Sequence, residues 1–268
     1  MVQSIMSNLT TDSRHITALN GGRIERAETS IFTLPAGITG YADAQIDDYG
    51  GQGGTFRWRP GTTLSLRARF SHDAATLRGT AGFGFWNAPY GEPSHRRPAL
   101  PRAVWFFFGS APNDLPFAPD APGRGWFAGT IDVRPSSVPA LVPLAPAVLL
   151  LNQFRAAREH IWPAVRRQLG IHAAPIVADM TTWHEYRIEW RVDSVTFLVD
   201  GMSLLETPRS PCGPLGFVCW LDNQYLVLTP RGRFRAGTLH TNTEQWMEIA
   251  DLRLEAGDKT IDTLGLAP

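Results

Sequence analysis

Segments in which polar and apolar residues alternate recur along most of the chain, and they constrain its fold more than any other feature. Residues 64–70, 184–190 and 41–47 each follow this two-residue period. Because successive side chains of a strand point to opposite faces, each segment predicts a strand with one buried face. The 25 glycines and 21 prolines scattered between such segments are typical of turns. The sequence therefore predicts an all-β chain, with two antiparallel sheets packed as a sandwich.

One region departs from this pattern. Between residues 144 and 169 the apolar residues return with helical spacing, and Gly170 suits the end of a helix. Pro163 is expected to kink or split the helix. The stripe comprises Leu151, Phe154, Arg158, Ile161 and Val165. We expect a helical insertion or lid over about residues 140–175, within a single domain that spans residues 1–268.

Charge and cysteine content exclude some classes of protein. The chain has 25 basic and 25 acidic residues, without the basic excess that is typical of nucleic-acid binding. Two cysteines, Cys212 and Cys219, fit free thiols in a reducing compartment. The longest apolar stretch, residues 138–151, contains three prolines and is too short to span a bilayer. No secretory leader is recognisable, so we expect a soluble cytoplasmic protein without a nucleic-acid partner.

Residues 183–201, WHEYRIEWRVDSVTFLVDG, resemble the W-H-x-Y-x-I-E-W…F-x-V-D-G signature of concanavalin A-like sandwiches. Within that superfamily the sequence is most similar to the family 16 glycoside hydrolases. Residues 82–89, GFGFWNAP, resemble the strand that precedes the family's catalytic strand, and residues 245–255 are similar to the last strand of the fold. The resemblance extends over residues 28–256 and implies a jelly-roll sandwich.

The catalytic signature of that family is absent. It reads E-x-D-x-x-E or E-x-D-x-E on the strand that here has the sequence RAVWFFFGS, residues 102–110. The resemblance thus implies the family's fold but, without these carboxylates, not its hydrolytic activity. Alternation places Ala103, Trp105 and Phe107 on one face and Val104, Phe106 and Phe108 on the other. Both faces are apolar, so we expect an aromatic wall in the concave cleft, covered by the helical insertion, by a ligand, or by both.

Polar residues inside apolar segments are the candidates for chemistry. Asp222, Asn223 and Gln224 interrupt the strand-like CWLDNQYL and are candidate catalytic groups, unless they form a hydrogen-bonded strand end. Asp43, Gln45 and Asp47 form a polar row that either lines the cleft or faces water. The remaining candidate ligand-binding residues are aromatic: Trp86, Trp105, Phe107, Trp220 and Tyr225.

Three functions fit these residues. The first is a non-hydrolytic sandwich that binds an apolar or amphiphilic small molecule and acts as a cyclase or isomerase, because an aromatic wall can hold a substrate folded and stabilise cationic charge. The second is a carbohydrate-binding module whose tryptophans stack on sugar faces. The third is a glycoside hydrolase with relocated carboxylates, for which Asp43, Asp47 and Asp222 are the plausible acids.

Cofactors and partners are constrained mainly by missing motifs. The seven histidines show no H-x-H or H-x-x-x-H spacing, and no cysteine pair supports a metal site. We therefore expect no cofactor, no metal ion, and a monomer with a small-molecule ligand, apolar or carbohydrate. The insertion is rich in arginine and aliphatic residues, and contact with a membrane surface is the alternative to its role as a lid.

Overall fold

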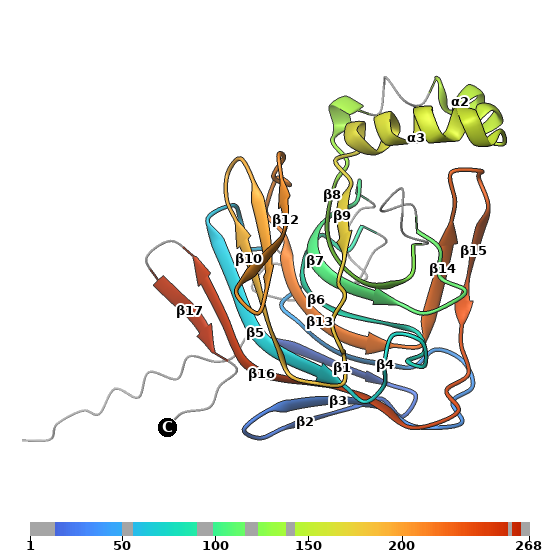
Figure 1. Ribbon diagram of the computed structural model, residues 1–268. Coiled ribbons are helices and arrows are strands. Elements are labelled where there is room, and N and C mark those ends of the chain that lie inside the picture. Colours follow the sequence, from blue (N-terminus) through green and yellow to red (C-terminus); the bar gives the residue numbers. More distant parts are fainter. Residues whose placement is uncertain are drawn as a thin grey trace, which may run out of the picture.

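Two antiparallel sheets packed face to face form the body of the protein (Figure 1). The computed structural model describes residues 14–49, 56–89, 99–115, 123–137, 143–256 and 259–263. The seven-stranded sheet has the order β1 (His15–Leu19), β4 (Asp43–Asp47), β13 (Gly216–Asp222), β6 (Thr80–Trp86), β7 (Arg102–Gly109), β8 (Gly125–Asp132) and β9 (His172–Pro175). The predicted all-β jelly-roll sandwich is confirmed.

The eight-stranded sheet forms the second layer. Its order is β12 (Met202–Thr207), β11 (Val195–Val199), β10 (His184–Trp190), β5 (Thr62–Phe70), β16 (Gln245–Ala256), β3 (Ser30–Leu34) and β2 (Arg23–Arg26), and β17 (Lys259–Thr263) pairs with β16. A separate hairpin, β14 (Gln224–Leu228) and β15 (Phe234–Thr238), stands at one end of the seven-stranded sheet (Figure 1).

Aromatic side chains fill the space between the sheets. Phe106 of β7 lies with its ring centre 5.1 Å from Tyr186 and 5.4 Å from Phe197, both on the opposite sheet. Phe85 of β6 lies 5.4 Å from Trp190 with the two rings tilted at 37°, while the Phe106 pairs are edge-to-face. All five side chains are buried, and edge-to-face contacts of this kind add to the hydrophobic gain of burial. The core therefore uses the even-numbered of the two faces that alternation predicted for β7.

The W-H…V-D-G segment has a structural role in the fold. Asp200 and Gly201 turn the chain between β11 and β12, with φ angles of +50° and +74°. The Asp200 carboxylate lies 2.6 Å from His184 Nδ1 and accepts a hydrogen bond from the Glu185 N–H at 2.9 Å. Aspartate and glycine are the residues that adopt positive φ most readily, so this pair suits the turn. The segment thus joins the start of β10 to the β11–β12 turn.

The insertion is helical, as predicted. α2 (Ala145–Leu151) and α3 (Arg155–Gln168) occupy the predicted range, whose first residues, 140–142, lie outside the described part. The break falls at residues 152–154, and α3 continues through Pro163. Neither helix has a fully buried residue, although Ile161, Trp162 and Val165 of α3 are half-buried, and the role of the insertion as a lid stays a prediction. No helix among the described residues is long and apolar enough to cross a membrane.

Replacing Asp200 by glycine tests the role of the turn. Glycine keeps the positive φ but removes both contacts, so we expect the free energy of unfolding to fall by about 1 kcal/mol, since the carboxylate is half exposed. Asp193→Gly is the matched control, because this exposed residue contacts only the Ser194 hydroxyl. Urea denaturation measures both variants. Equal losses in the two would show that the Asp200 contacts contribute nothing.

Candidate functional site

The outer face of the seven-stranded sheet, turned away from the other sheet, carries a second aromatic layer. The aromatic cluster is defined here as Trp86, Trp105, Phe107, Phe127 and Trp220. Trp105 is at its centre, with ring centres 5.2 Å from Trp86, 5.3 Å from Phe107 and 5.7 Å from Trp220. The odd-numbered face of β7 therefore lines the concave side of the sandwich, as the alternation of residues 103–108 requires.

Two glycines of β6 make room for these rings. Gly82 and Gly84 lie on the outer face of β6, between the phenylalanines that point into the core. A Cβ atom on Gly82 would come within 2.7 Å of Trp220 Cη2, and one on Gly84 within 2.8 Å of Trp105 Cβ. Gly84 also has a φ of +148°, where side chains are strained. The indole rings of β7 and β13 can therefore lie close over β6.

The cluster is nearly closed to solvent. Trp105 is 8% exposed and Trp220 is 7% exposed. Six side chains from outside the sheet pack against the aromatic cluster: Tyr49, Phe56, Leu115, Leu169, Ile171 and Leu226. Only Leu169 and Ile171 belong to the predicted insertion, and both follow α3 in sequence. The predicted cover is thus supplied, within the described chain, mostly by segments that join strands.

The predicted polar row lies on this same face. In the register of the sheet, Asp43 of β4 is directly opposite Asp222 of β13, and Gln45 is directly opposite Trp220. Asp43 and Asp47 are each 3% exposed, so the row lines the concave face instead of facing water. The structure therefore brings Asp43, Gln45, Asp47 and Asp222 together at the edge of the aromatic cluster.

Asp222 is held through one of its two carboxylate oxygens. Oδ1 accepts hydrogen bonds from the Thr80 hydroxyl at 2.8 Å, the Thr80 N–H at 3.2 Å and the Gln224 N–H at 2.9 Å. The Thr80 hydroxyl also accepts a hydrogen bond from Trp220 Nε1 at 2.9 Å. Burial raises the pKa of Asp222 to about 6, against the lowering effect of these hydrogen bonds. The aromatic cluster and a weakly acidic carboxyl group are thus joined through one threonine.

Tyr41 belongs to this group although it was not among the predicted site residues. Burial raises its pKa, and the nearby carboxylates of Asp43 and Asp222 raise it further. The Gln224 side chain acts on the same phenol. The sequence signal was available, since Tyr41 precedes Asp43 by two residues and shares its face. The phenol therefore stays protonated beside the two carboxyl groups and can donate a hydrogen bond.

Asp47, at the other end of the row, has both oxygens engaged. Gln45 Nε2 donates to Oδ2 at 2.8 Å, and the Tyr49 N–H donates to Oδ1 at 2.9 Å. His15 Nδ1 lies 3.6 Å from Oδ2. Asp47 thus orders Gln45 and the chain that leads to Tyr49.

Asn223 and Tyr225 are not brought into this group. The Asn223 side chain accepts from the Ala42 N–H at 2.9 Å and donates to the carbonyls of Gly40 at 2.8 Å and Leu239 at 2.9 Å. Its amide is therefore fully used by the backbone, which matches the alternative of a hydrogen-bonded strand end. Tyr225 lies on β14 under the Arg235 guanidinium, 5.6 Å from the ring centre.

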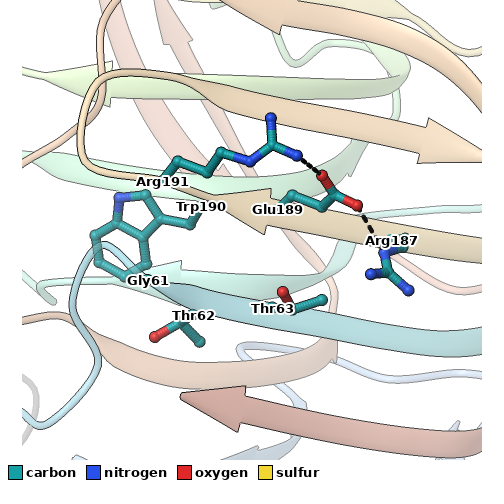
Figure 2. Close-up of a pocket in the computed structure, with 7 residues that line it drawn as sticks. All are labelled: Gly61, Thr62, Thr63, Arg187, Glu189, Trp190 and Arg191. Carbon is teal, nitrogen blue, oxygen red and sulfur yellow. Dashed lines mark hydrogen bonds and ion pairs between the residues drawn. The ribbon is translucent and has the colours of Figure 1, made fainter. Parts of the chain in front are cut away.

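A pocket of about 250 Å³ lies on the other sheet and was not predicted. Residues 61–63 line it together with Arg187, Glu189, Trp190 and Arg191 (Figure 2). Glu189 is held between two guanidinium groups, with Arg187 Nε at 3.1 Å and Arg191 Nη2 at 2.5 Å (Figure 2). The Glu189 carboxylate offsets the charge of only one of the two guanidinium groups, and among the described residues no aspartate or histidine lines the pocket. The aromatic cluster with its carboxyl groups is therefore the better candidate site.

The described residues contain no arrangement of side chains suited to hold a metal ion. Among them, no group of three or more histidine, cysteine, aspartate and glutamate side chains is placed to hold a metal ion. Cys212 and Cys219 are both free thiols, and burial raises the pKa of the Cys219 thiol. The chemistry that these residues can offer is thus proton donation, hydrogen bonding and stacking.

Comparison with known proteins gives a likeness of fold. No family model matches the chain, and no curated protein matches it. Among solved structures, the Crh5 transglycosylase in complex with NAG aligns at 14% identity with a TM-score of 0.49, covering 94% of this chain and 82% of that one. The Emp47p carbohydrate recognition domain aligns at 10% identity and 0.48, covering 92% and 89%.

An endo-β-1,4-glucuronan lyase from the fungus Trichoderma reesei aligns at 12% identity with a TM-score of 0.47, covering 90% of each chain. All three alignments lie at or below 14% identity and below a TM-score of 0.5, so the resemblance to concanavalin A-like sandwiches continues to rest on residues 183–201. At such identities and TM-scores the alignments contribute nothing to the assignment of an activity, which depends on the residues of this chain.

The raised pKa of Asp222 makes stability depend on pH. Its folded-state pKa of about 6 exceeds the unfolded value near 3.9, so the folded state binds the proton more tightly, and the stability that this gives at low pH is lost as pH rises through about 6. Asp222→Asn cannot ionise. We expect the unfolding free energy of the variant, relative to the parent protein, to rise by up to about 3 kcal/mol between about pH 4 and about pH 7.

Urea denaturation across this range measures the difference. Carboxyl ¹³C NMR provides the direct control, since one aspartate resonance with a midpoint near pH 6 should disappear in Asp222→Asn. A difference in unfolding free energy that is constant with pH would contradict the desolvation of Asp222.

Proposed function

We propose that the concave face of the seven-stranded sheet binds a neutral carbohydrate, and that Asp222 donates a proton to it with Asp43 as the second carboxyl group. The observation that carries the proposal is the direct cross-strand pairing of Asp43 and Asp222 at the edge of the aromatic cluster. Asp47 and Tyr41 complete the polar side of the face. This is the arrangement of a sugar-processing site whose carboxylates have moved from β7 to β4 and β13.

The spacing of the pair supports acid catalysis at a glycosidic bond. Side chains directly opposite each other on antiparallel strands have Cβ atoms about 4.5–5.5 Å apart. Retaining glycosidases hold their two carboxyl groups about 5–5.5 Å apart, one as proton donor and one as nucleophile. Desolvation keeps the proton on Asp222 up to pH values near 6, which suits the donor. Asp43 then takes the second role.

The aromatic cluster would supply the surface on which sugar rings stack once the side chains that cover it are displaced. Trp220 is tied to Asp222 through the Thr80 hydroxyl, so a sugar against this indole would lie close to the carboxyl pair. Three buried aspartates on one face would repel a polyanionic sugar, which is why we specify a neutral carbohydrate. The residues proposed for stacking and those proposed for acid chemistry thus lie on the same surface.

A second candidate is an apolar or amphiphilic small molecule, bound by an enzyme of cyclase or isomerase type. It is favoured by the near-complete burial of Trp105 and Phe107 and by the lack of any acid on β7. A ligand that displaced the covering side chains would meet mainly ring faces. In that case Asp222 would polarise a single functional group of the ligand.

Binding and turnover of a panel of neutral oligosaccharides test the proposal. Tryptophan fluorescence reports binding, because Trp105 and Trp220 lie at the site. We expect Asp222→Asn to bind the sugar but to lose turnover by about 10²–10⁴-fold, since it cannot donate a proton. For the parent protein, turnover should decline as pH rises above about 6, where Asp222 loses its proton.

Asp193→Asn is the matched control, an exposed aspartate on the other sheet that should leave turnover unchanged. Turnover that survives in Asp222→Asn would contradict the role of the donor. If no saccharide binds while the dye 8-anilinonaphthalene-1-sulfonate binds and raises the melting temperature, the apolar ligand is the correct class.

A further inference from the structure

The corner formed by α2, the start of α3 and the β14–β15 hairpin exposes an unusual amount of apolar surface. Among the described residues, thirteen large hydrophobic side chains are exposed, and seven of them lie on these elements. This apolar corner is defined as Leu144, Leu149, Leu150, Leu151, Phe154, Leu228 and Phe234. Phe154 is 64% exposed and Phe234 is 73% exposed.

The two elements form one surface. Asn152 Nδ2 donates to the Pro230 carbonyl at 3.1 Å, and Gln153 Nε2 donates to the Arg231 carbonyl at 3.1 Å. A Cβ atom on Gly232 would lie 3.3 Å from the Leu149 side chain. Figure 1 shows the helices at the end of the sandwich, close to the turn of the β14–β15 hairpin. The end of α2 is therefore attached to that turn.

α2 lacks a polar face. Its sequence, APAVLLL, is apolar all round, and no residue of the helix is buried. A helix of this kind normally lies inside a protein or in a membrane, because exposing aliphatic side chains to water is unfavourable. The surface therefore needs a partner with a large apolar area.

Charge identifies that partner. Residues 144–169 and 224–238 contain seven arginines and one acidic residue, Glu159, which leaves 18 basic and 24 acidic residues in the rest of the chain. Arg231, Arg233 and Arg235 surround the hairpin turn, and Arg155 and Arg167 lie on α3, all exposed. Aliphatic side chains bordered by arginine match a bilayer surface that carries anionic headgroups over an apolar interior.

We propose that the apolar corner docks the protein on an anionic lipid surface. Leu150 and Phe154 would enter the boundary between headgroups and acyl chains, and the hairpin arginines would contact the headgroup phosphates. The inference is separate from the proposed function, because it uses no residue of the concave face.

Flotation of the full-length protein with lipid vesicles tests the proposal. We expect binding to vesicles made of equal parts phosphatidylcholine and phosphatidylglycerol, and little binding to phosphatidylcholine alone. The double variant Leu150→Gln, Phe154→Gln should weaken binding to the anionic vesicles by at least about tenfold through lost apolar burial. Arg231→Gln with Arg233→Gln should weaken it by at least about tenfold at low salt.

Val177→Gln with Val192→Gln is the matched control. These two valines are 99% and 80% exposed but lie away from the corner, so their replacement should leave vesicle binding unchanged. Because the replaced side chains are exposed, all variants should keep their melting temperature. Failure of the parent protein to bind anionic vesicles would overturn the proposal.

Two further outcomes would also overturn it. Vesicle binding that is equal in the parent protein and in the Leu150, Phe154 variant would exclude the apolar corner as the contact. Sedimentation of the parent protein as a dimer, converted to a monomer by the same variant, without vesicle binding, would assign the surface to a second copy of the chain.

Discussion

β7 buries large side chains on both of its faces, and the rest of the structure is arranged around that fact. An outer face of an antiparallel sheet is usually hydrated, but here Trp105 and Phe107 require cover as complete as that of Phe106 on the inner face. Gly82 and Gly84 have no side chains, so the aromatic rings can lie close over the neighbouring strand β6. Side chains from connecting segments cover these rings. The concave side thereby becomes a second, smaller core.

This second core also determines the electrostatics of the candidate site. Acidic residues are absent from β7 and appear instead on β4 and β13, where the aromatic cluster ends. Asp222 lies at that boundary, and the apolar side chains beside it remove the water that would otherwise stabilise its charge. A carboxyl group that keeps its proton up to about pH 6 is thus a consequence of how the tryptophans pack.

Much of the fold could be predicted because alternation is a local property. The strands, the faces of residues 103–108 and the helices between residues 144 and 169 all follow from spacing along the chain. The cover of the concave face could not be predicted, because a stripe such as Leu151 and Phe154 shows that a helix has an apolar side but not what that side contacts. Both side chains turned out to be exposed.

The candidate site was predictable only in part. Asp43 and Asp222 could each be identified as polar residues in apolar strands, but their pairing joins positions 179 residues apart and depends on sheet order. Asn223 has the same local signal as Asp222, yet it points to backbone groups and not to the concave face. Neighbouring polar residues of one sequence motif thus have different roles, which only the tertiary structure distinguishes.

The hydrogen bond from the Ala42 N–H to the Asn223 side chain has a consequence for the two carboxyl groups. Ala42 precedes Asp43, and Asn223 follows Asp222, so this single amide bridges the backbone immediately beside both acids. It adds to the β4–β13 pairing that already places the two acids opposite each other, and it needs no contact with a ligand. Variation at position 223 would therefore adjust the spacing of the pair, and with it their mutual repulsion, while the surface that meets a ligand stayed the same.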